Sequence, residues 1–192
     1  MVIQAPVPHS YGRSVAERSA AIVDRTLGAR STFTIRPVRA TDRRALSDFY
    51  AGLSPASRYM RFMGFSAGID ELRARTFCTP DHVHEEGFVA VLDKASPEQI
   101  VGHLCLQPYG TRKLELAVAV GDGFQGQGIG RQLITAAISW AEHQGYEAIA
   151  ATAFADNWRV LRLLSSAGHP AHVIPAGGGT VDVLIPLRAA LD

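Results

Sequence analysis

The hydrophobic positions from residue 113 to residue 141 follow two different periods, one after the other. Residues 114–120 are apolar except at Glu115, and the length and composition of this run predict a buried strand. A turn at 121–123 and a glycine-rich segment at 125–130 follow. Apolar residues then recur at helical spacing, at Ile129, Leu133, Ile134, Ile138 and Ala141. The pattern therefore predicts a strand, a glycine loop and a helix, in that order.

The rest of the pattern predicts one mixed α/β domain, residues 31–192, preceded by a separate segment, residues 1–30. That segment is a tail with an extra helix over 14–27, where apolar and charged residues alternate at helical spacing. The other strands are predicted at 33–36, 87–92, 99–107, 148–154, 171–174 and 180–185. The other helices are predicted at 42–53, 56–63, 68–77 and 157–167.

A glycine loop between a strand and a helix is suited to an anion. The first turn of a helix has unpaired N–H groups and the positive end of the helix dipole, and glycines let a phosphate approach them closely. A P-loop is excluded because no Gly-Lys-Ser/Thr closes the segment. The spacing Gly121, Gly123, Gly126 matches G-x-G-x-x-G, but it ends before the helix and lacks the acidic residue of a dinucleotide site.

The segment instead resembles the signature Q/R-x-x-G-x-G/A of the GNAT superfamily of N-acetyltransferases, with Gln125, Gly128 and Gly130 at the specified positions. The resemblance implies a splayed central sheet flanked by helices, with acetyl-CoA as the acetyl donor. It also implies a set of coenzyme-binding residues that act mostly through the main chain. These are Val118, Ala119, Val120, Gln125, Gly126, Gln127, Gly128, Ile129, Gly130, Arg131 and Asn157. For Asn157, a plain helix N-cap is an equally good interpretation.

Glu115 is the candidate general base. A carboxylate among apolar neighbours is costly to bury unless it is paired or protonated, and a carboxyl that holds its proton more tightly suits base catalysis. The run Leu-Glu-Leu-Ala-x-x-Val from residue 114 also resembles the bacterial protein lysine acetyltransferases of the superfamily, in which a glutamate here is the base. The alternative is that strand pleating turns Glu115 to solvent.

The other chemistry is less complete. Many members of the superfamily carry a tyrosine seven residues after the asparagine, where this chain has Leu164. On the acceptor side, Arg58 and Arg61 are expected to bind acidic residues that flank an acceptor lysine on a protein. A small amine, such as a polyamine or an aminoglycoside, and a non-catalytic acyl-CoA-binding domain stay open as alternatives.

Composition narrows the partners further. The net charge of +1 over 192 residues gives no reason to expect nucleic acid or an anionic membrane. Cys78 and Cys105 lie in apolar sequence surroundings, as expected of reduced, buried thiols. His82 and His84 are not spaced as the ligands of a zinc site, so we expect no metal. No run is long enough to span a membrane and no signal peptide opens the chain. We expect a cytoplasmic protein, monomer or homodimer.

Overall fold

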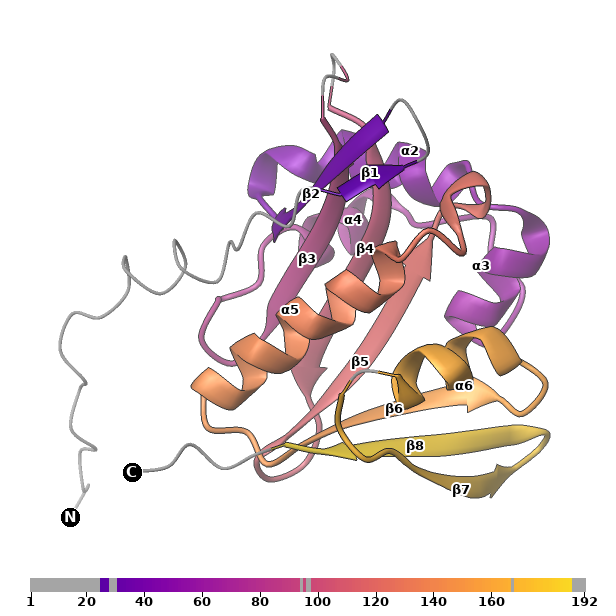
Figure 1. Cartoon of the computed structure of the whole chain (residues 1–192). Helices are drawn as coiled ribbons and strands as arrows, with labels where there is room; N and C mark the ends of the chain where they lie inside the picture. The colour runs from indigo at the N-terminus through magenta and orange to yellow at the C-terminus, as the bar shows by residue number, and fades with distance from the viewer. Residues whose placement is uncertain (1–24, 28–30, 94, 96–97, 167, 188–192) are drawn as a thin grey trace, which may run out of the picture.

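The structure is a computed structural model that describes residues 25–27, 31–93, 95, 98–166 and 168–187. Its strands are β1 (Arg25–Leu27), β2 (Ser31–Pro37), β3 (Glu86–Leu92), β4 (Ile100–Pro108), β5 (Lys113–Val120), β6 (Ala148–Phe154), β7 (His172–Gly177) and β8 (Thr180–Pro186). Its helices are α2 (Arg43–Ala51), α3 (Pro55–Phe62), α4 (Glu71–Phe77), α5 (Ile129–His143) and α6 (Trp158–Ser165), with short 3-10 turns η1 (Ala40–Asp42) and η2 (Asp122–Phe124). Figure 1 shows their arrangement.

The predicted mixed α/β class and the predicted elements from residue 31 onward are confirmed, with ends shifted by a few residues. The helix predicted at 68–77 begins only at Glu71, because the carboxylate of Asp70 accepts the N–H of Arg73 and caps it there. The tail and most of the helix predicted at 14–27 lie outside the described residues. For the last three residues of that segment the helix prediction is wrong, because Arg25–Leu27 pair with β2 as the edge strand β1.

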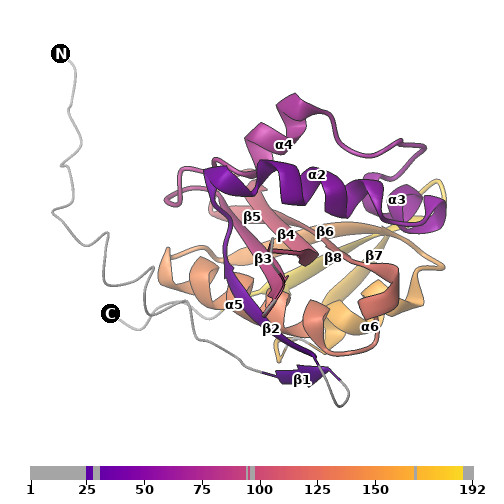
Figure 2. The ribbon, with the colours of Figure 1, turned by 90° about the horizontal axis from the view of Figure 1, so that it is seen from above.

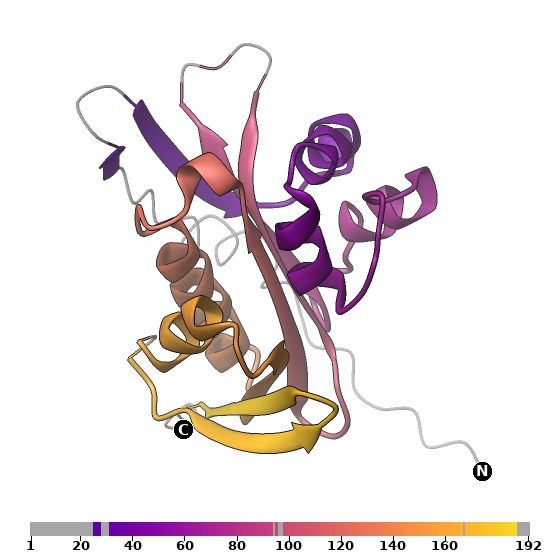
Figure 3. The ribbon, with the colours of Figure 1, turned by 90° about the vertical axis from the view of Figure 1, so that its right-hand side faces the viewer.

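The described strands form one sheet in the order β1-β2-β3-β4-β5-β6-β8-β7, antiparallel except between β5 and β6. Helices α2, α3 and α4 lie on one face, and α5 and α6 lie on the other (Figures 2 and 3). Two apolar clusters fix these layers. The larger is centred on α5 and includes Leu114 and Leu116, and the smaller joins α2 to the opposite face through Leu46, Phe49 and Tyr50.

The sheet is interrupted where β5 and β6 separate. They pair in parallel only at 113–115 with 148–150, whereas β5 pairs with β4, and β6 with β8, along nearly their whole lengths. Figure 1 shows the two strands leaving a common start and diverging. The second half of β5 therefore has an edge, inside the sheet, that is paired with no other strand of the described residues.

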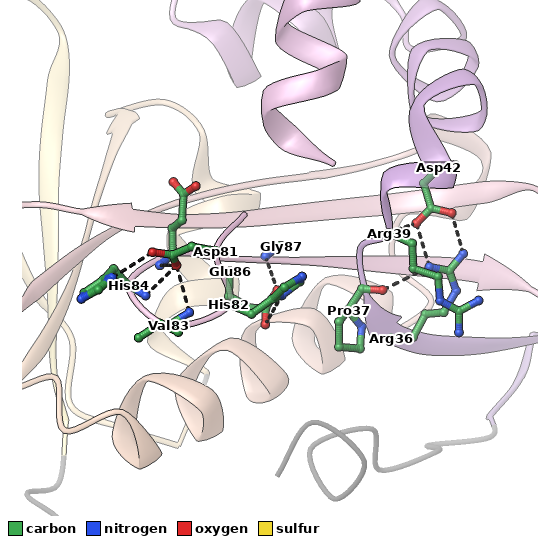
Figure 4. A network of polar contacts seen from close by, with 11 residues as sticks. Arg36, Pro37, Arg39, Asp42, Asp81, His82, Val83, His84, Glu86 and Gly87 are labelled. Carbon is green, nitrogen blue, oxygen red and sulfur yellow. Dashed lines mark hydrogen bonds and ion pairs between the residues drawn. The ribbon is translucent and has the colours of Figure 1, made fainter. Parts of the chain in front are cut away.

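A buried ion pair anchors the start of the helical layer on β2 (Figure 4). The Arg36 guanidinium donates to both carboxylate oxygens of Asp42, at 2.7 and 2.8 Å, and both residues are buried. Asp42 also accepts the N–H of Arg39 at 2.8 Å. Burial by itself would raise the pKa of Asp42, but the hydrogen bonds from Arg36 and Arg39 outweigh burial and lower it.

Figure 4 also shows the loop before β3, where two histidines are paired with acidic residues. His82 Nδ1 lies 2.9 Å from the buried carboxylate of Glu86, and His84 Nδ1 lies 2.8 Å from Asp81. In the part of the chain that the structure describes, no group of three or more such side chains is placed to hold a metal ion. No described helix is both long and apolar enough to span a membrane.

Candidate active site

An open cleft of about 1770 Å³ lies over the separated halves of β5 and β6. Residues of α3 and α4 line one wall, α6 and β6 line the other, and the glycine loop closes one end. Most of the candidate site residues line this cleft: Arg61, Glu115, Val118, Ala119, Val120, Gln125, Gly126, Gly128, Ile129, Gly130, Arg131 and Asn157. Arg58 and Gln127 are not among the lining residues.

The hydrogen-bonding register of β5 shows which peptide groups face the gap. The N–H of Gly121 donates to the carbonyl of Val101 at 2.9 Å, so the neighbouring pair Val120–Gly102 is of the non-hydrogen-bonded type. The peptide groups of Val118 and Val120 therefore point away from β4, toward the gap. In agreement, the carbonyl of Val120 accepts from Gln125 Nε2 at 3.1 Å. The N–H groups of Val118 and Val120 have no strand partner among the described residues.

Ala119 corrects one expectation for this edge. It pairs with His103, one position along from the Val120–Gly102 pair, so its N–H and C=O lie within the β4–β5 ladder. Its main chain is thus used by the sheet. Ala119 can contact a ligand only through its methyl group, which lies on the side of the smaller apolar cluster.

The start of α5 presents a row of unused donors. The first helical bond recorded runs from the N–H of Gln132 to the carbonyl of Gly128, at 3.2 Å. Among the described residues, no acceptor is recorded for the N–H groups of residues 126–131. Gly126 and Gly128 have φ of 76° and 87°, a conformation that glycine adopts without strain, and it turns the chain into the helix. This is the geometry of an anion site.

Gly130 has a packing role in addition to the main-chain role that the motif implies. A Cβ atom there would lie 2.8 Å from Cδ2 of Leu163 and 3.6 Å from Cγ2 of Val120. Glycine fits here because α5 packs closely against α6, and a side chain at 130 would displace the end of Leu163. The side chain of Gln127 also has a local role, since its Nε2 donates to the carbonyl of Gly123 at 2.9 Å.

Gln125 connects the loop to both walls. Its Oε1 accepts from Arg159 Nη1 at 3.1 Å, and its Nε2 lies 3.4 Å from the hydroxyl of Ser57. Asp122 holds the start of α3, accepting from Ser57 Oγ at 2.6 Å and from the N–H and hydroxyl of Ser54. These contacts join residues more than thirty positions apart, and nothing in the local sequence pattern indicates them.

Asn157 is the N-cap of α6, as one of the two interpretations had it. Its Oδ1 accepts the N–H of Val160 at 3.3 Å. The residue also lines the cleft, and no described residue accepts from its side-chain nitrogen. The capping role is therefore observed, and the geometry leaves the amide free to donate to a ligand.

Glu115 lies in the cleft but is exposed, which corrects the expectation that it is buried. The strand alternates: Leu114 and Leu116 enter the core under α5, and Glu115 faces the side of α3 and α4, opposite Gln107 of β4. No ion pair to its carboxylate is recorded from the described residues. The carboxylate is therefore available to a ligand, and burial by the protein does not prepare it as a base.

Arg58 points away from the expected acceptor. Its Nη1 donates to the carbonyls of Ala51 and Leu53, at 3.0 and 2.7 Å, so it caps the end of α2. Arg61, one helical turn later, turns inward and lines the cleft. Trp158 is 62% exposed at the edge of the cleft, whereas Leu164 is buried where many superfamily members have tyrosine.

Comparisons with known proteins agree with this fold. The model of the acetyltransferase (GNAT) family matches residues 56–168. A search of curated proteins finds no match. Among solved structures, the GNAT domain of S. lividans PAT aligns with a TM-score of 0.76 at 22% identity, over 86% of this chain and 97% of that chain.

Two further structures were determined with acetyl-CoA. The first is yncA, a putative acetyltransferase from Salmonella typhimurium (TM-score 0.63, 19% identity, 83% of this chain and 95% of that chain). The second is a phosphinothricin acetyltransferase from Sinorhizobium meliloti (TM-score 0.61, 17% identity, 81% of this chain and 88% of that chain). At these identities the likeness concerns the fold.

Proposed function

The chain belongs to the acetyltransferase (GNAT) family, and we propose that it transfers the acetyl group of acetyl-CoA to the side-chain amine of a lysine on a protein, with Glu115 as the general base. One observation carries the proposal: a single cleft combines an unpaired strand edge, the unused N–H groups at the start of α5, and an exposed carboxylate without an ion-pair partner among the described residues.

The donor would be held by main-chain groups. The N–H groups of residues 126–131 suit the pyrophosphate of the coenzyme, because a helix start combines free donors with the positive end of a dipole. The free edge at Val118 and Val120 suits the amide groups of the pantetheine arm, which would bond to it as an added strand does. The same N–H groups can polarise the thioester carbonyl.

The acceptor side supplies the proton transfer. A lysine ammonium has a reference pKa near 10.4, so a base must remove a proton before the nitrogen can attack. Glu115 would take that proton as the new C–N bond forms and the C–S bond breaks. An acceptor that covers Glu115 would also exclude water from it, so the acceptor itself would supply the desolvation that the free protein lacks.

The leaving thiolate has no dedicated acid at position 164, because Leu164 is apolar and buried. Thiols have an ordinary pKa near 8.5, so a thiolate can leave without a proton donor at its side. Leu164 is also the one observation that favours a non-catalytic acyl-CoA-binding domain, and the experiment below separates the two functions.

The rim of the cleft supports a protein as the acceptor. Apolar side chains are exposed there: Met63 at 37%, Leu72 at 72% and Trp158 at 62%, with the fully exposed Phe65 ring next to Tyr59 of α3. Exposed apolar groups gathered at one place favour contact with a protein surface. A polyamine or aminoglycoside would need several free carboxylates, but two of the four acidic residues that line the cleft, Asp70 and Asp122, are already occupied as helix-start acceptors, which leaves Glu115 and Asp156.

Replacing Glu115 with glutamine tests the function. Glu115→Gln keeps the shape but cannot accept a proton, so turnover should fall by about tenfold to a thousandfold, with acetyl-CoA affinity unchanged in calorimetry. Glu85→Gln, at a partly exposed glutamate that does not line the cleft, is the matched control.

Labelled acetyl-CoA and a protein extract identify the acceptor. Discrete labelled protein bands are expected with wild type and Glu85→Gln. If Glu115→Gln turned over at the wild-type rate, Glu115 would not be the general base. If small amines alone were labelled, the acceptor would be a small amine and not a protein. If acetyl-CoA bound without any transfer, the chain would be a non-catalytic acyl-CoA-binding domain.

A further inference from the structure

Arg61 is a cation enclosed by neutral groups on the acceptor wall of the cleft. Its Cζ lies 5.9, 5.1 and 5.7 Å from the ring centroids of Tyr50, Phe62 and Phe77. Its Nη2 donates to the sulfur of Cys105 at 3.4 Å, and a thiol sulfur is a weak acceptor. Its Nε is buried, and no described residue accepts from it.

The groups beneath Arg61 carry no compensating charge. Burial, with a further contribution from the Arg61 charge, lowers the pKa of His103 to about 3, so its imidazole is neutral. Burial raises the pKa of Tyr50 to about 12 and also raises the pKa of Cys105, so the phenol and the thiol keep their protons. The Tyr50 hydroxyl forms a hydrogen bond with His103 Nδ1, at 2.8 Å.

No carboxylate of the described residues forms an ion pair with Arg61. Arg61 is half-buried, and an arginine partly withdrawn from water is ordinarily paired with a carboxylate or phosphate, because its fixed charge and planar set of donors are costly to leave uncompensated. Cation–π contacts with three rings compensate part of that cost. The remaining donors border the cleft and are available to an anion that enters it.

The position of Arg61 separates this anion from the coenzyme phosphates. Cys105, beneath Arg61, lies opposite Ala117, and Glu115 is the diagonal neighbour on the same face of the β4–β5 pair, about 7–8 Å away. The glycine loop begins beyond Val120, about 10 Å farther along the strand. An anion at Arg61 would therefore lie next to the amine at Glu115.

We propose that Arg61 forms a subsite for a carboxylate on the acceptor, within reach of the amine that is acetylated. This rests on the proposed function, because it uses Glu115 to place the amine. Arg73 widens the subsite: it also lines the cleft, and its guanidinium lies 5.4 Å from the Phe62 ring that Arg61 contacts. The carboxylate can belong to an acidic residue beside a protein lysine or be the α-carboxylate of a free amino acid.

Two matched pairs of acceptors test the subsite with the wild-type protein. The first is one lysine peptide with glutamate or glutamine beside the lysine. The second is free lysine against cadaverine, which is lysine without its carboxylate. In at least one pair, kcat/KM for the carboxylated acceptor should be higher by about tenfold to a hundredfold, the range for hydrogen bonds to a charged group. The pair that responds identifies the source of the carboxylate.

Variants then assign the preference to Arg61. Arg61→Gln should bring the ratio within each responding pair close to one by raising KM for the carboxylated acceptor, with the acetyl-CoA Kd unchanged. Arg61→Lys, which keeps the charge and guards against a folding defect, should retain part of the preference. Arg75→Gln removes an exposed charge of α4 that does not line the cleft, and should retain all of it.

Equal rates within both pairs for the wild type, or an undiminished preference in Arg61→Gln, would overturn the subsite while leaving the transferase function in place. If acetyl-CoA binds and none of these amines is acetylated, the proposed function fails, and the subsite fails with it.

Discussion

Gly130 offers a quantitative test of how the glycine motif is built. In Gly130→Ala the new Cβ would lie 2.8 Å from Leu163 Cδ2 and 3.5 Å from its Cδ1, so the leucine must move. Overpacking of this kind costs about 1–3 kcal/mol, and alanine returns up to about 1 kcal/mol as a better helix former than glycine. We expect the free energy of unfolding to fall by about 1 kcal/mol, or about 2–4 °C in Tm for a chain of this size.

The assay is a double-mutant cycle followed by thermal unfolding. In a Leu163→Ala background the clash is absent, so adding Gly130→Ala should be neutral or stabilising. Because Gly130, Leu163 and Val120 all line the cleft, the single variant should also weaken acetyl-CoA binding in calorimetry, and the double variant should recover part of it.

Gly126→Ala provides a contrast within the same loop. A Cβ there meets nothing within 4 Å, but φ is 76°, so its cost of about 1–2 kcal/mol comes from the backbone and should not depend on Leu163. The packing explanation would be refuted if Gly130→Ala lost the same stability with and without Leu163, or lost none.

Two further predictions concern the elements beneath the acceptor wall. Arg58→Met should lower stability by about 1–2 kcal/mol, because the carbonyls of Ala51 and Leu53 lose their charged donor, but acceptor preference should not change in peptide kinetics. Asp42→Asn should cost about 1.5–3 kcal/mol at pH 7, because the buried Arg36 guanidinium loses its buried carboxylate and keeps the half-exposed carboxylate of Glu98 as its ion-pair partner. Since the folded pKa of Asp42 is lowered, the pair stabilises the protein above the ordinary carboxyl pKa near 4, and this contribution is lost as the pH falls through the folded pKa. In urea titrations the stability difference between wild type and Asp42→Asn should therefore start to shrink as the pH falls below about 4, and a difference that stays constant with falling pH would contradict this account.

The fold was largely accessible from the sequence because its signals are local. The switch from a strand to helical spacing at residues 114–141, the proline at the start of α3 and the run that became β6 each depend on neighbouring residues. The free N–H row at the start of α5 follows from the same local pattern. These predictions held because hydrophobic periodicity specifies an element and the face that it buries.

Glu115, Arg58 and Gly130 show where local reasoning ends. Residues 117–120 read as a strand buried on both faces, but they are half-buried because one side borders the cleft, and Glu115 follows the pleat to the open side. Arg58 donates to the carbonyls of Ala51 and Leu53 at the end of α2. Gly130 lies against Leu163, thirty-three residues away. Such partners are set by how layers stack, which one sequence does not specify.

The divergence of β5 and β6 also changes how the two sides of the sheet are joined. Among the described residues, the sheet is continuous across this point only through 113–115 and 148–150, while β6, β8 and β7 are paired with one another. Across the gap the two sides are joined by side chains: the Phe154 ring of β6 stacks on Tyr59 of α3, and Arg159 of α6 donates to Gln125. A coenzyme bound along the free edge of β5 would therefore add main-chain bonding at a place where the protein's own connections are side-chain contacts.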